Sequence, residues 1–356
     1  MNDKTTTAAQ DEQFRKDFGL SGIRKPVPTF PGFVPYVPGA KISAPGAYRG
    51  VPMAVYHGEE PCDSPSISST GLKILAAEKG ARKKGQTPRH YFEGSHLNPK
   101  RKPKRDTDAL RLGRAFHDCL LDPEAWDRDY HVLPEGFSRA ASVKQAAAIA
   151  EADAAIADGL TVLTIKEVER TYAYCDAIQA DPLILPFLSN GEAEVTFAWK
   201  DEATGVWCRA RPDWMLADLS AGINFKTDAD ASWSGFSTSI AKFGYAQSAA
   251  FELDGYLAVF GEAPRRYLHP VVEKVGEGYE AGDWIPTALW ELPDEDIERG
   301  RWLNRIALNR FAECLSSGKW PGYNDGEPEL CGLPSYARHV IDNGGAAEPA
   351  DDEINA

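Results

Sequence analysis

The sequence predicts a mixed α/β fold. Three observations support this prediction: helical apolar patterns fill the first half of the chain, an alternating hairpin pattern follows them, and a helix and further strands come after the hairpin. A length of 356 residues is enough to bury a large core, either as one large domain or as two modest ones. We find no internal repeat.

The chain divides into an arm, a folded region and a tail. Residues 1–45 are rich in Thr, Pro and Gly, which predicts an extended or disordered N-terminal arm. The predicted α/β elements occupy residues 46–330. Residues 331–356 form a C-terminal tail, and its end, residues 343–356, consists largely of Gly, Ala and acidic residues, which predicts disorder there.

Four helices are expected before the hairpin. The first spans residues 66–79, where serine and threonine caps precede an apolar run. Residues 80–105 contain several Pro and Gly and little periodicity, which predicts mostly loop. A helix over residues 106–121 has one apolar face, and two further helices are expected at 140–158 and 163–180.

The second half of the chain begins with a predicted β-hairpin. An alternating strand starts at Glu194, a turn containing Gly covers residues 201–205, and a return strand covers 206–214. Residues 223–226 predict a short third strand, and a helix follows at about 236–260. The remaining expected elements are strands at residues 267–272 and 285–290 and a last helix at 293–316.

Composition excludes several classes of protein. No apolar stretch of 18 residues is present, so we expect no transmembrane helix and no membrane partner. The N-terminus lacks the apolar segment of a secretory signal, which favours a cytoplasmic location. The six cysteines are scattered without a CxxC pair, which predicts reduced thiols and gives no support for an iron–sulfur site.

The charge of the chain is unevenly distributed. The net charge of −14 argues against a nucleic-acid binder if it is taken as an average. Between residues 73 and 114, however, thirteen Lys or Arg residues and four acids give a local net charge of +9, which leaves −23 for the rest of the chain. Because counterion release depends on where basic groups lie, residues 79–105 within this segment are the candidate DNA-contact region. The alternative is a solvated basic loop.

Three side chains of the β region have the chemistry of a metal-dependent phosphodiesterase. Glu194 starts the first hairpin strand, Asp213 follows Pro212 near the end of the second, and Lys226 lies 13 residues after Asp213. Carboxylates on neighbouring strands can hold Mg²⁺ or Mn²⁺, and a nearby lysine can orient the attacking water. Taken singly, the three have ordinary alternatives: a solvated glutamate, a Pro-Asp turn and an edge lysine.

Three further side chains are weaker candidates. His117 ends the helical run Leu-Gly-Arg-Ala-Phe-His, and its alternative is a satisfied helix histidine. Tyr245 and Gln247 lie on the helix after the third strand, from which they could reach a phosphate or a metal-bound water. Their spacing alone is not specific.

In chain order, these motifs resemble the RecE-type exonuclease VIII family of phage and prophage recombination nucleases, within the PD-(D/E)xK superfamily. The most specific pieces are the Gly-Arg-Ala-Phe-His run ending at His117 and the Arg-Pro-Asp run ending at Asp213. The similarity covers roughly residues 45–260. It implies a restriction-endonuclease-like core, with a central mixed β-sheet flanked by helices, in a nuclease domain of residues 46–330 that starts with a helical and basic segment.

The resemblance also implies an activity and its residues. It implies an Mg²⁺-dependent 5′→3′ exonuclease that degrades one strand of linear double-stranded DNA and leaves 3′ single strands for an annealing protein. A homo-oligomer in the cytoplasm of a bacterium or a phage-infected host is expected. The expected metal ligands are His117, Glu194, Asp213 and, at the position of the motif acid, Asn224. The expected catalytic residues are Lys226, Asp213, Glu194, Gln247 and Tyr245. The expected DNA-binding residues are Lys83, Lys84, Arg89, Lys100, Arg101, Lys102, Lys104, Arg105, Arg114 and Arg211.

The sequence departs from the family at Asn224, two residues before Lys226, where the motif has Asp or Glu. A neutral amide binds Mg²⁺ less well than a carboxylate does. Three explanations are open: a laboratory substitution that traps a DNA complex, a natural nuclease whose acid has moved to Asp218 or Asp228, and a natural DNA-binding relic. The other site residues are present, which favours the first. An inactive DNA-binding or recombination scaffold and an endonuclease of the same fold are the alternative functions.

Overall fold

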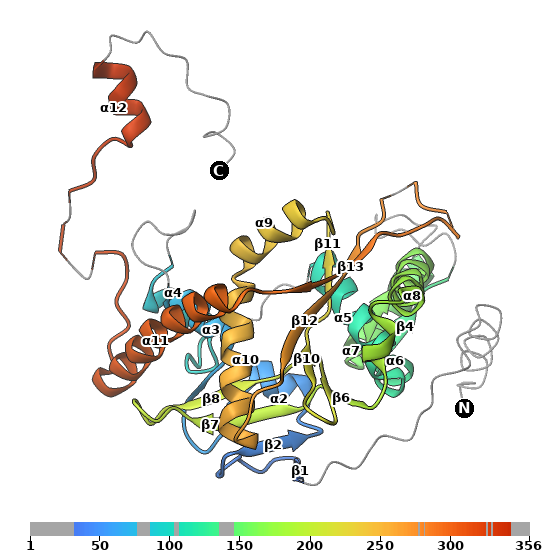
Figure 1. Ribbon diagram of the computed structural model, residues 1–356, viewed down its shortest axis with the longest axis horizontal. Coiled ribbons are helices and arrows are strands. Elements are labelled where there is room, and N and C mark those ends of the chain that lie inside the picture. The colour runs from blue at the N-terminus through green and yellow to red at the C-terminus, as the bar shows by residue number, and fades with distance from the viewer. Residues whose placement is uncertain are drawn as a thin grey trace.

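The computed structural model contains two β-sheets that share one long hairpin, with helices packed against them (Figure 1). The mixed α/β fold class is therefore confirmed, although the strands form two main sheets where a single central one was expected. The structure describes residues 32–76, 86–102, 107–134, 146–276, 278–280, 282–324, 327–328 and 330–342.

The first sheet has five strands in the order β1-β2-β7-β8-β3. They are Phe33–Pro35 (β1), Gly46–Arg49 (β2), Ser66–Ile67 (β3), Thr196–Lys200 (β7) and Trp207–Ala210 (β8). Strands β7 and β8 form the predicted hairpin, in whose turn Asp201 accepts a hydrogen bond from the Thr204 amide at 3.0 Å. Because β1 pairs with β2, the described end of the expected N-terminal arm belongs to this sheet.

The second sheet has six strands, in the order β11-β12-β10-β9-β6 with β13 on β12. They are Gly191–Ala193 (β6), Trp214–Leu216 (β9), Ala221–Ile223 (β10), Lys226–Asp228 (β11), Arg266–Glu273 (β12) and Thr287–Glu291 (β13). Strands β4 (Tyr130–Val132) and β5 (Thr161–Leu163) pair separately.

One hairpin passes from the second sheet into the first and back. Strand β6 pairs with β9 in the second sheet, whereas β7 pairs with β8 in the first. Glu194 and Val195 connect β6 to β7, and residues 211–213 connect β8 to β9. Glu194 has a φ angle of 55°, which is uncommon for a residue other than glycine. The position expected to start a strand is thus a bend between two sheets.

The expected third strand is the interrupted middle of a longer one. Strands β10 and β11 both run parallel to β12 in one register, since Ile223 opposes Leu268 and Lys226 opposes Val271. Between them, the Asn224 amide donates to the Leu268 carbonyl oxygen of β12 at 2.9 Å. The Phe225 carbonyl, one residue on, points away from β12, to the side where β11 has no described neighbouring strand, and is available to side chains.

The helices cover both sheets. They are Met53–Gly58 (α2), Ser69–Leu75 (α3), Pro88–Gly94 (α4), Asp108–Leu121 (α5), Pro123–Asp129 (α6), Ala146–Ala157 (α7), Ile165–Ala180 (α8), Leu185–Leu188 (η2, a 3₁₀ turn), Trp233–Phe243 (α9), Tyr245–Phe260 (α10), Asp294–Ser317 (α11) and Ser335–Asp342 (α12).

Several of these helices differ from expectation. Helix α3 begins only after β3, so the helix expected from residue 66 is shorter at its start. Helix α4 lies in the segment expected to be loop. The helix expected at residues 236–260 is two helices, because Gly244 adopts the left-handed conformation (φ 64°) and ends α9. The arm before residue 32, the tail beyond residue 342 and the start of the helix expected at 140–158 lie outside the described residues.

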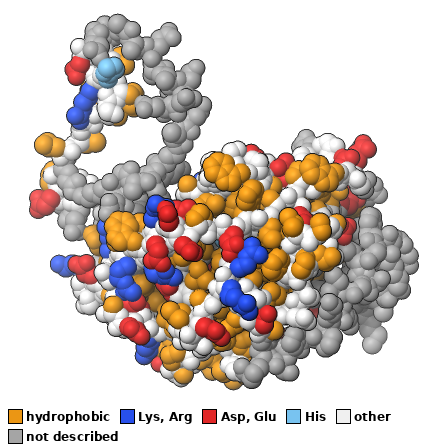
Figure 2. Space-filling view, viewed as in Figure 1, with side chains coloured by type: hydrophobic (Ala, Val, Ile, Leu, Met, Phe, Trp, Pro, Cys, Tyr) orange, Lys and Arg blue, Asp and Glu red, His pale blue; other side chains and the backbone are white. Residues whose placement is uncertain are grey.

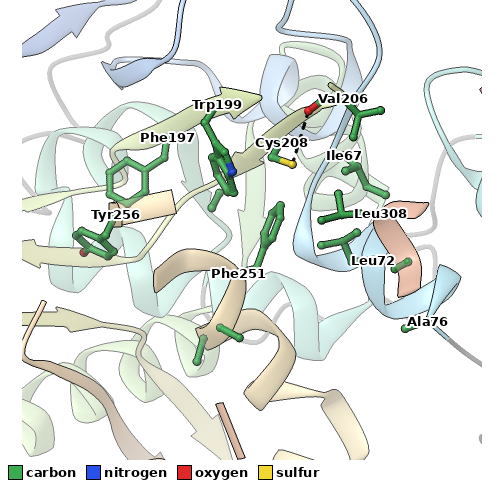
Figure 3. Close-up of a cluster of buried hydrophobic side chains, with 14 of the residues drawn as sticks. Ile67, Leu72, Ala76, Phe197, Trp199, Val206, Cys208, Phe251, Tyr256 and Leu308 are labelled. Atoms are coloured by element: carbon green, nitrogen blue, oxygen red, sulfur yellow. Dashed lines mark hydrogen bonds between the residues drawn. The ribbon is translucent and has the colours of Figure 1, made fainter. Parts of the chain in front are cut away.

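The larger apolar core lies between the first sheet and helices α3, α10 and α11. Figure 3 shows side chains of β7 and α10 pointing toward one another. The rings of Phe197 and Tyr256 are 4.7 Å apart between centroids, and those of Trp199 and Phe251 are 4.8 Å apart. These aromatic contacts fix α10 over the first sheet.

A second core packs α5 and α8 against the second sheet. Phe116 of α5 belongs to this core together with Ile223 and Phe225. Because successive side chains of a strand point to opposite faces, Asn224 and Lys226 point to the other face, toward α10. This alternation separates an apolar face of the interrupted strand from a polar one.

The described surface shows no dominant charge on the face in Figure 2, where acidic and basic side chains are interspersed among apolar ones. None of the described helices has the length and apolar character needed to cross a membrane. Helix α12 has no buried residue and is set apart from the rest of the fold (Figure 1).

Candidate metal centre and active site

Three of the expected metal ligands converge. His117, Glu194 and Asp213 each offer a ligand atom, and these atoms all lie within 4.8 Å of one another. His117 comes from α5, whereas Glu194 and Asp213 lie on the two sides of the bend in the long hairpin. His117 Nδ1 is 3.7 Å from Asp213 Oδ1. The bend therefore brings together side chains that are far apart in sequence.

The orientation of His117 is set by a backbone carbonyl. Its Nε2 lies 3.2 Å from the carbonyl oxygen of Phe225. Because a carbonyl oxygen only accepts, Nε2 carries the hydrogen, and Nδ1 presents its lone pair to the cluster. This tautomer is the one that a metal ligand requires, with the second ring nitrogen held by a hydrogen bond.

Glu194 lies at the bend with an unusual electrostatic environment. Its amide donates to the carbonyl oxygen of Asp213 at 3.1 Å, which joins the two sides of the hairpin. Burial raises the pKa of Glu194 to about 7, the carboxylate of Asp213 adds to this effect, and the guanidinium of Arg211, 3.4 Å away, opposes it. A further cation bound at this carboxyl would favour its ionised form near neutral pH.

Asp213 has a buried oxygen without a hydrogen-bond partner. The residue is 9% exposed, and no described donor bonds to its Oδ2. The nearest cation is Lys226 Nζ, at 3.8 Å. A buried carboxylate oxygen without a donor is costly unless a cation contacts it. Together with the oxygen and nitrogen donors of Glu194 and His117, this atom makes the site fit a divalent ion such as Mg²⁺ or Mn²⁺.

Lys226 lies at the edge of the cluster. Its Nζ donates to the carbonyl oxygen of Phe225 at 2.8 Å and to Asn224 Oδ1. The same ammonium group lies 5.5 Å from the centre of the Tyr245 ring. Tyr245 in turn stacks on His269, whose pKa is lowered to about 3, chiefly by burial and further by the charge of Lys226. The structure therefore brings Lys226 and Tyr245 to the expected site.

Asn224 contacts a carboxylate that sequence reasoning missed. Its Nδ2 lies 3.2 Å from Glu252 Oε1, 3.3 Å from Glu252 Oε2 and 3.2 Å from the Tyr267 hydroxyl. The Tyr267 hydroxyl also donates to Glu252. Burial raises the pKa of Glu252 to about 8. One signal could have revealed it: Glu252 is seven residues after Tyr245, which is two helical turns along the same face.

Gln247 does not reach the cluster. It is 3% exposed, and its Nε2 donates to Asn304 Oδ1 of α11 at 3.3 Å. Asn304 Nδ2 donates back to the Gln247 carbonyl oxygen at 2.9 Å. Residues two positions apart on a helix point in nearly opposite directions, so Tyr245 and Gln247 cannot share the site. In this structure Gln247 therefore takes part in the packing of α10 against α11 and is not brought to the expected site.

The two acids considered as substitutes for the motif acid also lie outside the metal cluster. Asp218 is exposed in the turn after β9 and accepts from the Ser220 amide at 2.9 Å. Asp228 ends β11 and accepts from the Ala229 amide at 2.7 Å. The structure therefore gives neither acid the place of the motif carboxylate.

Apart from Arg211, the expected DNA-binding residues separate into three groups. Lys83, Lys84, Lys104 and Arg105 lie outside the described residues. Lys100, Lys102 and Arg114 are exposed, and Arg114 lies one turn before His117 on α5. Arg89 pairs with Glu93 at 2.5 Å, and Arg101 donates to the carbonyl oxygen of Gly58.

Arg211 is enclosed by the protein. Only 5% of its side chain is exposed. Its Nε donates to Thr196 Oγ1 at 2.8 Å, and its Nη2 donates to the Val51 carbonyl oxygen at 2.7 Å. Arg211 is therefore enclosed in the fold, where it pairs with Glu194, and its guanidinium group is not exposed for the expected DNA contact.

Comparison with known proteins shows the family to which the chain belongs. The model of the PDDEXK-like domain of unknown function (DUF3799) matches residues 82–336. A candidate exonuclease from Eubacterium rectale superposes with a TM-score of 0.50 at 16% identity, covering 79% of this chain and 94% of that one. A phage-related exonuclease from Haemophilus somnus is 10% identical and covers 72% of this chain and 97% of that one, with a TM-score of only 0.26. No curated protein matches the chain.

Proposed function

The chain belongs to the family of PDDEXK-like domains described as DUF3799, and on this premise we propose that it is a divalent-metal-dependent DNA exonuclease. The observation that carries the proposal is the convergence of His117, Glu194 and Asp213 beside Lys226, with a buried Asp213 oxygen that no described donor satisfies. The family match supports a nuclease of the PD-(D/E)xK type. The direction of digestion and the partner molecules are also proposed, beyond what the family match supports.

The residues of the site would have different roles in phosphodiester hydrolysis. His117, Glu194 and Asp213 would hold the ion, which when bound neutralises charge on the phosphate and lowers the pKa of a coordinated water. Lys226 lies within reach of that position, where its ammonium group can orient the attacking water and stabilise developing negative charge. Tyr245 lies over the lysine and limits its motion.

The proposed substrate is the end of linear double-stranded DNA, degraded from 5′ to 3′ on one strand. The resemblance to the RecE-type family over residues 45–260 supports this direction, the release of 3′ single strands to an annealing protein, and a homo-oligomer. Mg²⁺ is the proposed ion, and Mn²⁺ has similar ligand preferences.

Digestion of end-labelled DNA tests the proposal. The full chain with Mg²⁺ or Mn²⁺ should release nucleotides from a 5′-labelled linear duplex early in the reaction, retain a 3′ label until late, and leave closed circular DNA intact. Equal cutting of circular DNA would indicate an endonuclease. No release from either end with either ion would contradict nuclease activity.

A second candidate function is a DNA-binding scaffold, and the neutral Asn224 at the motif position is the observation that favours it. A scaffold should bind DNA equally well with and without a divalent ion, whereas the proposed nuclease should bind the ion at His117, Glu194 and Asp213. Titration of DNA binding with Mg²⁺, compared between the full chain and Asp213→Asn, separates the two functions.

A further inference from the structure

A row of three aromatic rings runs from the protein interior to the surface. Tyr245 stacks on the buried ring of His269, with 6.1 Å between ring centroids and 24° between the ring planes. Phe243 stacks on Tyr245 in turn, at 5.6 Å and 29°. His269 is 1% exposed, whereas Phe243 is 46% exposed. The outer ring of the row is therefore open to a molecule in solution.

The contact between the two outer rings depends on the residue between them. Phe243 ends α9, Tyr245 begins α10, and Gly244 joins the two helices in the left-handed conformation, with φ 64° and ψ 46°. In a continuous helix, side chains two positions apart do not face each other. The turn at Gly244, which favours a residue without a Cβ atom, brings the two rings together. The local backbone thus holds an exposed ring in a fixed stack at the point where α9 and α10 meet (Figure 1).

Three lysine ammonium groups lie around this pair of rings. Lys242 Nζ is 5.3 Å from the centre of the Phe243 ring. Near the centre of the Tyr245 ring are Lys226 Nζ, at 5.5 Å, and Lys73 Nζ of α3, at 5.9 Å. Aromatic rings and cations are the two features with which proteins bind a nucleic-acid strand, because the rings stack on bases and the cations neutralise phosphates.

The rings are also connected to the metal cluster. Lys226, beside the Tyr245 ring, lies 3.8 Å from Asp213. The two carboxylates whose charges act on the Tyr245 hydroxyl are Asp228, which is buried, and Asp213, which a bound ion would neutralise. Lys242, by contrast, is exposed beside the outer ring. The charge next to the exposed ring is therefore complementary to a phosphate.

We propose that Phe243 and Tyr245 form a stacking platform for an unpaired base of the DNA strand that enters the metal cluster, with Lys242 beside a phosphate of that strand. This inference rests on the proposed function and specifies the form of the substrate. Digestion of one strand separates it from its complement, which costs pairing and stacking free energy at the end of the duplex. An aromatic ring restores part of that free energy for any sequence, since every base has a π-face.

A DNA duplex with one splayed end tests the proposal. The unpaired strand carries 2-aminopurine, whose fluorescence falls when the base stacks, at one position after another. In EDTA, where the metal-dependent cleavage is stopped, the native chain should quench this fluorescence at one or two adjacent positions. Phe243→Ala should abolish the quenching and weaken binding of the splayed end, measured by fluorescence anisotropy, about 5- to 100-fold, the range expected for the loss of one base–aromatic stack.

Conservative variants separate stacking from other contacts. Phe243→Tyr keeps the ring and should retain the quenching and the affinity. Phe243→Leu keeps an apolar side chain without a π-face and should behave like Phe243→Ala. The matched control is Tyr336→Ala, which removes a ring of similar exposure (52%) on α12 and should change neither quantity. Lys242→Ala should reduce the slope of log affinity against log salt by about 0.7, the value for one phosphate of a single strand.

Four results would overturn the proposal. They are the absence of quenching at every position with the native chain, an unchanged affinity in Phe243→Ala, native quenching in Phe243→Leu, and an equal loss of affinity for a blunt duplex and for the splayed end. The last result would assign the two rings to paired DNA. An unchanged salt slope in Lys242→Ala would contradict the phosphate contact.

The same variants separate this inference from the nuclease proposal. If quenching by the native chain is lost in Phe243→Ala but the native chain digests no DNA with Mg²⁺ or Mn²⁺, the stacking platform stands and the exonuclease proposal fails. If the native chain digests DNA and Phe243→Ala binds the splayed end as well as the native chain does, the exonuclease proposal stands and the platform fails.

Discussion

His117 and Lys226 are both oriented by the backbone carbonyl oxygen of Phe225. The imidazole Nε2 lies 3.2 Å from this oxygen, and the lysine Nζ lies 2.8 Å from it. The Asn224 amide donates to the Leu268 carbonyl oxygen of β12, so the Phe225 carbonyl, one residue on, points away from β12. It is available because β11 has no described neighbouring strand on that side. One backbone oxygen thus positions the proposed metal ligand and the proposed catalytic lysine.

Removal of the lysine should abolish cleavage without abolishing binding. In Lys226→Ala, the rate of DNA digestion should fall at least about 100-fold, because an oriented cation near the reacting phosphate is removed. DNA affinity without cleavage and Mn²⁺ affinity should each change by less than about threefold. Single-turnover digestion and calorimetry measure these quantities. A full cleavage rate in this variant would remove Lys226 from the mechanism, and Lys166→Ala on the exposed surface of α8 is the control.

Metal affinity should depend on pH through Glu194. Its pKa is raised from 4.5 to about 7, chiefly by burial, so below pH 7 a proton must leave before the carboxylate can bind an ion. Mn²⁺ affinity should therefore fall about tenfold per pH unit below this pKa. The folded chain also holds this proton more tightly than the unfolded chain does, so the Glu194 contribution to stability decreases as pH rises from 4.5 to about 7.

Glu194→Gln is the control for this pH dependence. The variant should bind Mn²⁺ more weakly at about pH 8, and its affinity should change less with pH. Its free energy of unfolding, measured with urea and no metal, should decline less between about pH 5 and pH 7 than that of the native chain. The same pH profile in both proteins would assign the titration to another group.

The exposed basic residues before α5 should contribute to DNA affinity through charge. Replacing Lys100 and Lys102 with Ala should weaken binding of duplex DNA and reduce the slope of log affinity against log salt by about two, close to one for each lysine that no longer neutralises a phosphate. Fluorescence anisotropy at several salt concentrations measures the slope. An unchanged slope would assign this segment a role other than DNA binding.

The packing of α10 against α11 should be sensitive to a single methyl group. In Gly300→Ala, the new Cβ atom would lie 2.3 Å from the Ala246 carbonyl oxygen, so α10 and α11 must separate. The free energy of unfolding in urea should fall by about 1–3 kcal/mol, as in other overpacked cores. Gly113→Ala on α5 is the control, because a Cβ atom there meets nothing within 4 Å and the change should be neutral or stabilising.

The sequence predicted the parts of the site that depend on local pattern. The alternation of residues in the hairpin pointed to Asp213, and the spacing of the motif pointed to Lys226. The structure places the Lys226 ammonium group 3.8 Å from the Asp213 carboxylate. The structure also places His117 beside them, although its helix gave only a weak signal. The proximity of these residues could be predicted because strand period and turn composition are local properties, and their roles stay predictions.

The sequence could not predict features that depend on a few backbone angles. The left-handed conformation of Glu194 divides one hairpin between two sheets, and that of Gly244 divides one helix in two. Alternation of apolar and polar residues is the same on both sides of such a bend. The position of Glu252 beside Asn224 depends on how α10 packs over the interrupted strand, which is set by tertiary contacts.

The bend at Glu194 also has a mechanical consequence. Glu194 and Asp213 lie on the two sides of the hairpin at the point where the first sheet meets the second, and their backbones share a hydrogen bond. An ion held by these two carboxylates and by His117 would clamp both sheets and α5 to one another at this point. Loading of the ion would therefore stiffen the joint between the two sheets, and chelation would soften it. The proposed metal centre would therefore join the two sheets structurally in addition to serving the reaction.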